Sequence, residues 1–469
     1  MTKKSNSDVA VHPGSFRDPA GFMFTSRKVI YRQINKVGAK DYDFFMSSGL
    51  YQALVDKKLL IPHREVELSI SLNHSLAYKI IKPSVIPFIS YPYEWSFSQL
   101  KSAALLTLEI QQIALQHGMT LKDATAYNVQ FVGKSPIFID TLSFSIYEPG
   151  APWEGYKQFC EHFLAPLAVA STSSPNILTT LKTMIDGVPL ELATRLLPAK
   201  SRLRLGLTSH LYIHKTAQSR HKNTETERIK PRVVSMFALK GLISSLERTI
   251  KKCNMPKVKT EWGNYYSFTN YSGAAFKAKK LLVEKYIQKV KPKNIWDLGG
   301  NTGEFSHIPA SKGIYTICFD IDPLAVEKNF LTREEASDDN LLPLVQDLTN
   351  ASPNLGWAHS ERQSLEERGP ADLCMALAIV HHLAIGNNLP LEMIAEFFSS
   401  LGKHLIIEFI PKEDSKVKIL LKSRPDIFPN YTKEGFEKAM ARYFKIESSE
   451  PIKGSKRTLY LLRSKNVKG

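Results

Sequence analysis

A glycine-rich turn, residues 296–305 (WDLGGNTGEF), lies between two apolar, strand-like runs of this 469-residue chain. Its three glycines allow the backbone to turn sharply and to approach a ligand closely. Asp297 ends the first run, and Glu304 follows the last glycine and is expected to open the next helix. Two carboxylates at such a turn repel phosphate and attract a cation, so the turn predicts a ligand that carries positive charge.

Three kinds of ligand compete for a glycine-rich turn of this type. A P-loop needs GxxxxGK followed by Ser or Thr, and the sequence has no such pair after the last glycine. A dinucleotide site has the spacing GxGxxG and places a pyrophosphate at the helix start. S-adenosylmethionine (SAM) has no phosphate and carries an ammonium and a sulfonium. The carboxylate of Asp297 therefore favours SAM.

The next two strand-like runs also end in acidic residues. Asp320 ends the run YTICFD, where its carboxylate is placed to accept hydrogen bonds from ribose hydroxyls. Asp347 follows LLPLVQ, where it is placed to bind an adenine amino group; the alternative is a helix N-cap or a surface carboxylate. Three acidic strand ends in succession are a more specific signal than one glycine-rich loop.

Two histidines follow the fourth strand-like run directly. His381 or His382 could act as the base that takes a proton from a methyl acceptor, or could bind that acceptor. The alternative is that both imidazoles are packed in the interior. Together with Glu408 they raise the possibility of a metal ion, but the spacing is not compact, so we predict no metal here.

Apolar runs of strand length alternate with helical patterns from about residue 262 to the C-terminus. This alternation predicts an α/β fold, a Rossmann-like and mostly parallel doubly wound sheet, preceded by a helix over GAAFKAKKLLVEKYIQKV. The expected strands are NIWDL, YTICFD, LLPLVQD, LCMALAIV, HLIIEFI, FKIESSE and RTLYLLR. Just upstream, the aromatic residues Trp262, Tyr265 and Tyr266 could close over the ligand or pack against the sheet edge.

Residues 262–463 resemble class I SAM-dependent methyltransferases, whose first motif matches DLGGNTG except at Asn301, where that family commonly has glycine. The resemblance implies that Asp320 holds the ribose and Asp347 the adenine of SAM, while ADLCMALAIVHHL lines the methyl-transfer cleft. The predicted cofactor-binding residues are Asp297, Gly299, Gly300, Asn301, Gly303, Asp320 and Asp347, and the predicted catalytic residues are His381 and His382.

Most of the chain also resembles the nodulation protein NoeA-like methyltransferases. The segments that carry this resemblance include SFRDPAGF, DATAYNVQF, FIDTLSF, QFCEHFLAPLA, AIVHHLAIGNN and DIFPNYT. It implies methyl transfer to an unidentified acceptor: a glycan, a lipid-linked sugar or a small metabolite. The rival prediction is a SAM-binding or regulatory protein that no longer catalyses.

A second group of polar residues lies near the front of the chain. Asp123, Asn128 and Asp140 follow a long amphipathic helix and resemble the catalytic loop and metal-binding Asp of protein-kinase-like phosphotransferases. The resemblance implies that Asp123 orients a hydroxyl and that Asn128 and Asp140 are magnesium candidates.

The front region departs from the kinase pattern at several points. Leu121 replaces the usual His, Thr141 and Leu142 replace Phe-Gly, and neither a GxGxxG loop nor a VAIK-type lysine is convincing; Lys79 and Lys82 are weak candidates. We therefore predict a degenerate kinase-like domain. An active phosphotransferase, or polar residues that only cap turns, are the alternatives.

The predicted organisation is a disordered tail (1–15), an α+β N-terminal domain (16–225), a basic linker or helix (226–261) and the methyltransferase domain (262–469). The net charge is +17, and residues 195–259 hold sixteen Lys or Arg against three Glu. This excess of positive charge could bind nucleic acid, anionic lipid or a phosphorylated substrate, or it could belong to a solvated linker. Methylation of nucleic acid is therefore an alternative function.

Composition excludes several other classes of protein. The four cysteines are scattered and form neither a disulfide framework nor a CxxC pattern. The polar start of the chain is not a signal peptide, and no run of about eighteen apolar residues predicts a transmembrane segment. We expect a cytoplasmic protein; the sequence predicts no oligomeric state.

Overall fold

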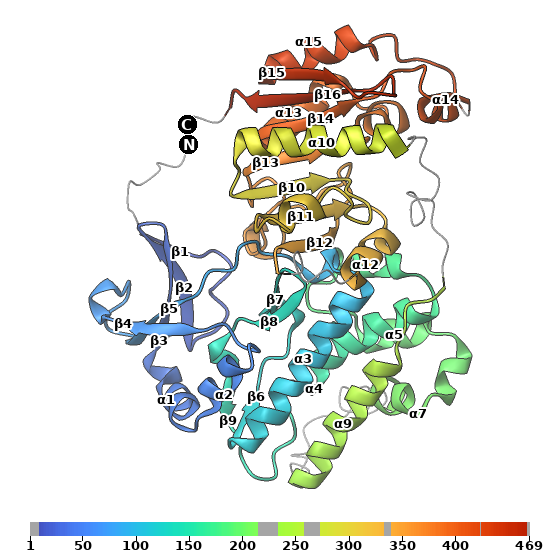
Figure 1. Ribbon diagram of the computed structural model, residues 1–469. Coiled ribbons are helices and arrows are strands. Elements are labelled where there is room, and N and C mark those ends of the chain that lie inside the picture. Colours follow the sequence, from blue (N-terminus) through green and yellow to red (C-terminus); the bar gives the residue numbers. More distant parts are fainter. Residues whose placement is uncertain (1–8, 214–232, 258–272, 333–338, 423, 467–469) are drawn as a thin grey trace.

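The computed structural model forms two units, an N-terminal unit (residues 9–257) and a C-terminal unit (residues 273–466), shown below and above in Figure 1. Within these limits the structure describes residues 9–213, 233–257, 273–332, 339–422 and 424–466. The predictions for residues 1–8, for the first part of the predicted linker or helix (226–232), and for Trp262, Tyr265 and Tyr266 lie outside the described residues.

The C-terminal unit is built on a seven-stranded sheet in the order β12-β11-β10-β13-β14-β16-β15. Its strands are β10 (Asn294–Leu298), β11 (Tyr315–Asp320), β12 (Leu341–Val345), β13 (Ala371–Ala376), β14 (Gly402–Phe409), β15 (Phe444–Pro451) and β16 (Thr458–Ser464). The strands from β12 to β14 are parallel, and β16 is antiparallel to its two neighbours. This order confirms the predicted Rossmann-like fold of class I methyltransferases.

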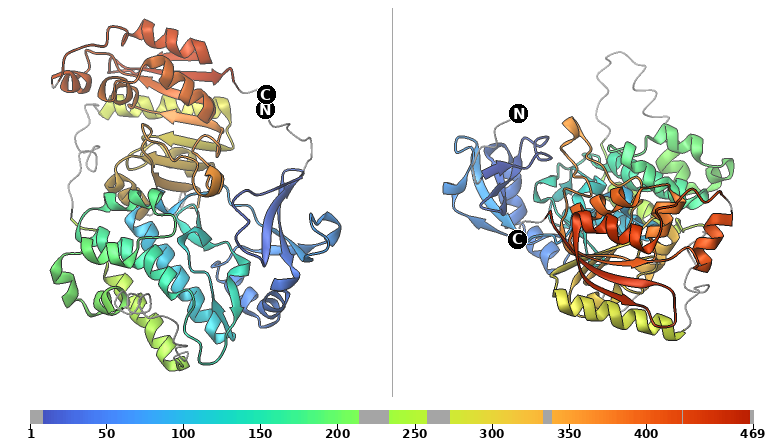
Figure 2. Two further views of the ribbon diagram at one scale, coloured as in Figure 1. Left: turned by 180° about the vertical axis from the view of Figure 1, so that it is seen from behind. Right: turned by 90° about the horizontal axis from the view of Figure 1, so that it is seen from above.

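Helices cover both faces of this sheet, so its strands are buried on both sides and consist of almost continuous apolar runs. Helix α10 (Gly273–Val290) lies on one face, and α13 (Leu391–Leu401) and α15 (Lys433–Tyr443) lie on the other (Figure 2). The remaining helices are α11 (His307–Ala310), α12 (Pro323–Leu331) and α14 (Ser415–Lys422). The sequence predicted that Glu304 opens the next helix. This was wrong, because α11 begins only at His307 and Glu304 lies in a turn.

Strand β10 is the point at which the strand order reverses. It pairs with β11 on one side and with β13 on the other, both in parallel. Ligands of open α/β sheets bind at such a switch point, outside the carboxyl ends of the strands. The glycine-rich turn follows β10 directly and so lies at this place.

The N-terminal unit begins with a five-stranded antiparallel sheet in the order β1-β2-β3-β5-β4. Its strands are β1 (Val9–Val11), β2 (Gly21–Ser26), β3 (Val29–Asn35), β4 (His63–Val66) and β5 (Ala77–Pro83), with α1 (Ala39–Ser47) and α2 (Leu50–Asp56) between β3 and β4. Residues 9–11 were expected in a disordered tail. This was wrong for these residues, because they pair with β2.

A long helix, α3 (Phe97–Gln116), forms the centre of the rest of this unit. Ser96 caps its first turn by accepting a hydrogen bond from Gln99 N, and the helix ends before Gly118, whose φ is 73°. Two small antiparallel strand pairs follow: β6 (Met119–Leu121) with β9 (Phe144–Ile146), and β7 (Val129–Val132) with β8 (Ser135–Phe138), of which only the second is a hairpin.

Short helices complete the N-terminal unit, among them α4 (Tyr156–Phe159), α5 (Ala165–Thr172), α6 (Leu190–Leu196) and α7 (Leu205–Leu207). The predicted basic linker or helix contains α9 (Met236–Lys252), which packs against α3. Leu239, Ile243, Leu246 and Ile250 of α9 are all fully buried. This helix is therefore part of the N-terminal core.

The two units share one hydrophobic core. Phe88 packs edge-on against Trp296 of β10 and Phe319 of β11, with ring centroids 5.5 and 6.0 Å apart. At the other end of the contact, Ser98 of α3 donates to Glu327 of α12 over 2.5 Å. The sheet that carries the glycine-rich turn is thus packed directly on the N-terminal unit.

Candidate functional site

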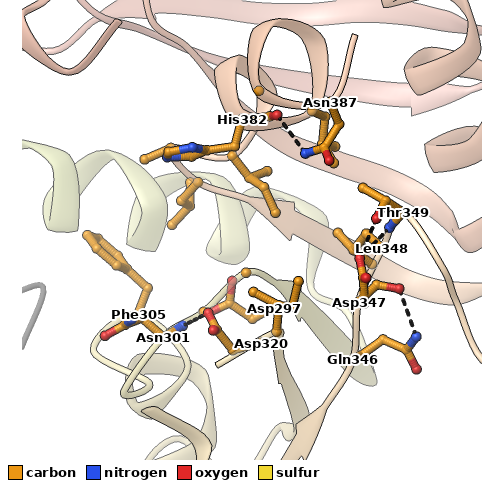
Figure 3. A pocket seen from close by; sticks show the side chains of 18 of the residues that line it. Asp297, Asn301, Phe305, Asp320, Gln346, Asp347, Leu348, Thr349, His382 and Asn387 are labelled. Carbon is orange, nitrogen blue, oxygen red and sulfur yellow. Dashed lines mark hydrogen bonds between the residues drawn. The ribbon is translucent and has the colours of Figure 1, made fainter. Parts of the chain in front are cut away.

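A cavity of about 270 Å³ lies at the carboxyl ends of β10, β11, β12 and β13. The loop after β10 contributes Gly299, Gly300 and Asn301 to its wall, and β11 contributes Asp320. Apolar side chains form much of the remaining wall, among them Phe276, Phe305, Ile321, Leu348, Leu377, Ile379 and Leu383. Figure 3 shows Asp297 and Asp320 on one side of this cavity and His382 with Asn387 on the other.

The glycine-rich turn depends on left-handed backbone at three residues. Gly299 has φ 79°, Gly303 has φ 87° and Asn301 has φ 52°. Asparagine is one of the few side chains that visit this region readily. Asn301, the departure from the methyltransferase motif, is therefore compatible with the turn. Gly303 shapes the turn without lining the cavity, and Gly300 has no room for a side chain, because a Cβ would lie 2.5 Å from Cys318 Sγ.

We expect Gly299→Ala to destabilise the protein more than Gly313→Ala does. Both residues have positive φ, 79° and 78°, so both variants carry the same backbone strain of about 1–2 kcal/mol. Only at Gly299 would the new Cβ clash, 2.6 Å from Ile379 Cδ1, whereas nothing lies within 4 Å at Gly313. Urea unfolding of the two variants measures the difference, which we expect to be about 1–3 kcal/mol. Equal losses would contradict the crowded turn.

The carboxylate of Asp297 is buried beneath the turn. Its Oδ2 accepts a hydrogen bond of 2.6 Å from Ser306 Oγ, and its Oδ1 accepts none from the described residues. Burial raises the pKa of Asp297 to about 6. A buried acceptor without a donor is costly, so this oxygen is suited to a ligand with a donor or a positive charge.

The carboxylate of Asp320 is fixed at the end of β11. Its Oδ2 accepts from Asn301 N over 2.8 Å, and its Oδ1 accepts from Asp322 N over 2.9 Å. Burial raises the pKa of Asp320 to about 6 as well. Each carboxylate oxygen can accept a second hydrogen bond, so Asp320 can bind two adjacent hydroxyl groups of a ligand.

Asp347 lies at the same end of the cavity, after β12. Its Oδ1 accepts from the backbone and the hydroxyl of Thr349, over 2.8 and 2.7 Å. The side chain thus stabilises the turn that follows β12, and it also lines the cavity. The alternative predicted from the sequence, a helix N-cap, was wrong, because a turn and not a helix follows Asp347; the predicted ligand contact is compatible with this position.

The two predicted catalytic histidines are not equivalent. His382 lines the cavity, whereas His381 is 2% exposed and does not. Burial lowers the pKa of His382 to about 4 and holds that of His381 well below its usual range. Both rings are therefore neutral near pH 7. Asn387 donates to the carbonyl of His382 over 2.9 Å and so stabilises the turn between them.

A buried ion-pair cluster behind the cavity was missed from the sequence. Lys279 of α10 lines the cavity and lies 2.7 Å from Glu408 Oε2, and Arg457 lies 3.3 Å from Glu408 Oε1. All three side chains are at most 3% exposed. Since Glu408 pairs with two cations, it is not placed to bind a metal ion with the histidines. Nowhere in the described residues do three His, Cys, Asp or Glu side chains form a group that could hold a metal.

The three kinase-like candidates do come together in the N-terminal unit. Asn128 donates to Ser143 Oγ over 3.1 Å, and Ser143 donates to Asp140 Oδ2 over 2.8 Å. Burial and then the charge of Asp140 raise the pKa of Asp123. The three side chains are therefore close neighbours.

Arg32 of β3 lies against Asp140, one of the two magnesium candidates. It forms an ion pair with Asp140 Oδ1, which also accepts from Leu142 N over 2.9 Å. Burial would raise the pKa of Asp140, but Arg32 and these hydrogen bonds lower it. The sequence offered Lys79 and Lys82 as weak candidates for the VAIK-type lysine of kinases, whereas Arg32 was not predicted. Lys79 pairs with Glu65 instead.

Helices that could cross a membrane are absent from the described part of the chain, since none there is both long and apolar enough. The sequence matches no family model. It is 36% identical over 453 residues to nodulation protein NoeA of Rhizobium meliloti (strain 1021), an alignment that covers 95% of this chain and 94% of NoeA.

The chain belongs to the NoeA family. The alignment with NoeA extends over both units, so the family relationship includes the N-terminal unit as well as the cavity-bearing sheet. The resemblance to NoeA predicted from the sequence is confirmed.

Solved structures match this member of the NoeA family only weakly. WbdD is 16% identical with a TM-score of 0.29, over 41% of this chain and 40% of WbdD. Magnesium protoporphyrin IX methyltransferase (ChlM) from Synechocystis PCC 6803, with bound SAH, is 18% identical with a TM-score of 0.30, over 43% of this chain and 93% of ChlM. The fold assignment above rests on the strand order of the sheet and not on these matches.

Proposed function

We propose that this protein transfers a methyl group from SAM to an acceptor. The observation that carries the proposal is the arrangement of Asp297, Asp320 and Asp347 at three successive strand ends around one largely apolar cavity. Such a cavity suits a ligand with a cationic end, a ribose and an adenine, and it disfavours a pyrophosphate.

The residues fit the parts of SAM as follows. The unpartnered Oδ1 of Asp297 suits the ammonium group, and the tight turn at Gly299 and Gly300 lets the backbone approach the ligand. Asp320 would accept hydrogen bonds from the ribose hydroxyls. Asp347 would receive the adenine amino group.

SAM supplies a methyl group on a sulfonium, which is already an excellent leaving group. The protein must therefore align the acceptor, exclude water and, for a hydroxyl acceptor, take up one proton. An imidazole nitrogen of neutral His382 is the candidate for that proton, since His382 lies across the cavity from Asp297 and Asp320 (Figure 3). His381 lies behind it, and we assign it a packing role.

The acceptor that we propose is a glycan, a lipid-linked sugar or a small metabolite; nucleic acid is the alternative suggested by the basic region. Calorimetric titration of SAM into the protein tests the cofactor. The acceptor is tested by incubating the protein and a cell extract with SAM that carries a labelled methyl group. The aqueous, lipid and nucleic-acid fractions are then separated, and the labelled fraction contains the acceptor. A folded protein that does not bind SAM would overturn the proposal.

SAM affinity should fall as the pH is lowered below about 6. Asp297 and Asp320 both have a pKa of about 6 in the free protein, and binding favours their ionised forms. Below that pH a proton must leave each carboxyl group on binding, so affinity falls roughly tenfold per pH unit for each group. Calorimetry between pH 5 and 8 checks this. Asp297→Asn should make the dependence shallower, and an unchanged slope would contradict the role of Asp297.

A second candidate function, binding of a magnesium nucleotide by the N-terminal unit, is favoured by one observation. Asp123, Asn128 and Asp140 are grouped beside Arg32, a cation on the N-terminal sheet that would take the role of the phosphate-binding lysine of protein kinases. Arg32 would have to leave Asp140 for the phosphates. Millimolar ATP with magnesium should then raise the unfolding temperature of the protein but not of Asn128→Ala. No shift in either protein would remove this candidate.

A further inference from the structure

A chain of buried polar contacts runs from the N-terminal unit to the wall of the cavity. It joins Arg368, Glu94 and Ser352 to Gln346, which lines the cavity beside Asp347. Glu94 is 1% exposed, Ser352 2% and Gln346 4%. Polar groups buried this deeply are held in place by their partners, so each contact restricts the next.

The first link is a bidentate ion pair between the units. Arg368 donates to Glu94 Oε1 over 2.6 Å and to Oε2 over 2.8 Å, and it donates to the carbonyl of Ile89 over 2.8 Å. Its guanidinium also lies 4.9 Å from the ring centroids of Phe88 and Tyr91. Planar bidentate pairing fixes the carboxylate in direction as well as in position.

The second link is the hydroxyl of Ser352. It lies 2.6 Å from Glu94 Oε1 and 2.9 Å from Gln346 Oε1, so its single hydrogen is shared between two acceptors. Gln346 in turn donates from Nε2 to the carbonyl of Asp347 over 3.2 Å. Its backbone N–H donates to the carbonyl of Asp320 over 2.8 Å. The chain of contacts thus ends at both acidic residues proposed for the adenosine part of SAM.

The position of β12 explains why such support is needed. This strand lies at the edge of the sheet, with β11 on one side and, among the described residues, no further strand on the other. Edge strands and the turns that follow them lack the hydrogen bonds of a second neighbour. Here η3 (Pro92–Glu94) of the N-terminal unit contacts β12.

We propose that Glu94 and Ser352 are positioning residues of the cofactor site. Through them the N-terminal unit fixes the turn after β12, and so the wall that receives the adenosine part of SAM. This inference rests on the proposed function, because it takes SAM as the ligand. The N-terminal unit is then a structural part of the cofactor site, whatever else it binds.

Two serine variants of the full chain test this inference. Ser352→Ala removes the middle link, and Ser98→Ala removes the 2.5 Å hydrogen bond to Glu327, which crosses the same interface away from the cavity. Both lose one hydroxyl that donates to a carboxylate. SAM affinity is measured by calorimetry, and the unfolding temperature of each variant is measured alongside.

The expected result is a rise in the dissociation constant for SAM of roughly five- to tenfold for Ser352→Ala and of less than about twofold for Ser98→Ala, with similar drops in unfolding temperature. A merely structural role would move the unfolding temperature and leave the affinity unchanged. If the two variants bound SAM with equal affinity, the inference would be wrong. The proposed function would still stand in that case, provided that the wild type binds SAM. Absence of SAM binding in the wild type would overturn both.

Discussion

Asp320→Ala is expected to raise the dissociation constant for SAM by roughly 100-fold or more. The carboxylate is the proposed acceptor for two ribose hydroxyls, and a hydrogen bond to a charged group contributes about 1.5–3 kcal/mol. The variant also leaves Asn301 N and Asp322 N without the acceptor that holds them at 2.8 and 2.9 Å. Calorimetric titration of SAM measures the loss, with circular dichroism to establish that the variant is folded.

Asp322→Ala is the matched control for this prediction. Asp322 lies two residues further on and is also buried, but its Oδ1 caps α12 by accepting from Leu324 N over 2.8 Å. Loss of the cap should lower stability by about 1 kcal/mol and leave SAM affinity within about threefold. If both variants bound SAM as tightly as the wild type, the ribose would lie elsewhere and Asp320 would only stabilise the loop.

The fold of the C-terminal unit could be predicted because its strands are buried on both faces. A strand of this kind is a short apolar run bounded by turn residues, and NIWDL, YTICFD and HLIIEFI all have this form. The ligand-binding edge follows from the same pattern, since the carboxyl ends of parallel strands lie together. Asp297, Asp320 and Asp347 were therefore found by position, without knowledge of any contact.

Helix α9 was harder to predict, because charged residues lie between the apolar residues that recur at helical spacing. Its exposed residues include Lys240, Arg248, Lys251 and Lys252, so the sequence left a basic linker and a helix both open. The buried residues Leu239, Ile243, Leu246 and Ile250 nevertheless recur at helical spacing. Strand β1 is only three residues long, and such a segment becomes ordered only by pairing with β2.

The ion pairs could not be predicted, because they join residues far apart in the sequence. Glu94 and Arg368 are 274 positions apart, and Arg32 and Asp140 are 108 apart. One signal was present for Lys279: it falls on the apolar side of α10, in line with Ala275 and Val283. A lysine on the buried side of a helix needs a carboxylate partner, which predicts a pair but not its identity.

The largest loss of stability is expected from Glu408→Ala. Glu408 is fully buried, and its carboxylate pairs with Lys279 at 2.7 Å and with Arg457 at 3.3 Å. Removal of one member of a buried pair leaves an uncompensated charge in the interior and costs about 3–5 kcal/mol. Arg457 keeps Asp414, 2.8 Å from its Nε, so Lys279 is the residue most affected. Urea unfolding of the variant measures the loss.

The double variant Lys279→Met/Glu408→Leu separates the charge from the packing. Apolar residues of similar size can replace a buried pair at little cost, so the double variant should recover most of the lost stability. SAM affinity should likewise be lowest in Glu408→Ala and mostly restored in the double variant. In Glu408→Ala the carboxylate of Asp297, whose charge already acts on Lys279, remains, and the lysine would compete with the ammonium of SAM for it. The double variant removes that competitor. If it bound SAM as weakly as Glu408→Ala, the loss would come from packing around the cavity, and Lys279 would not act on Asp297.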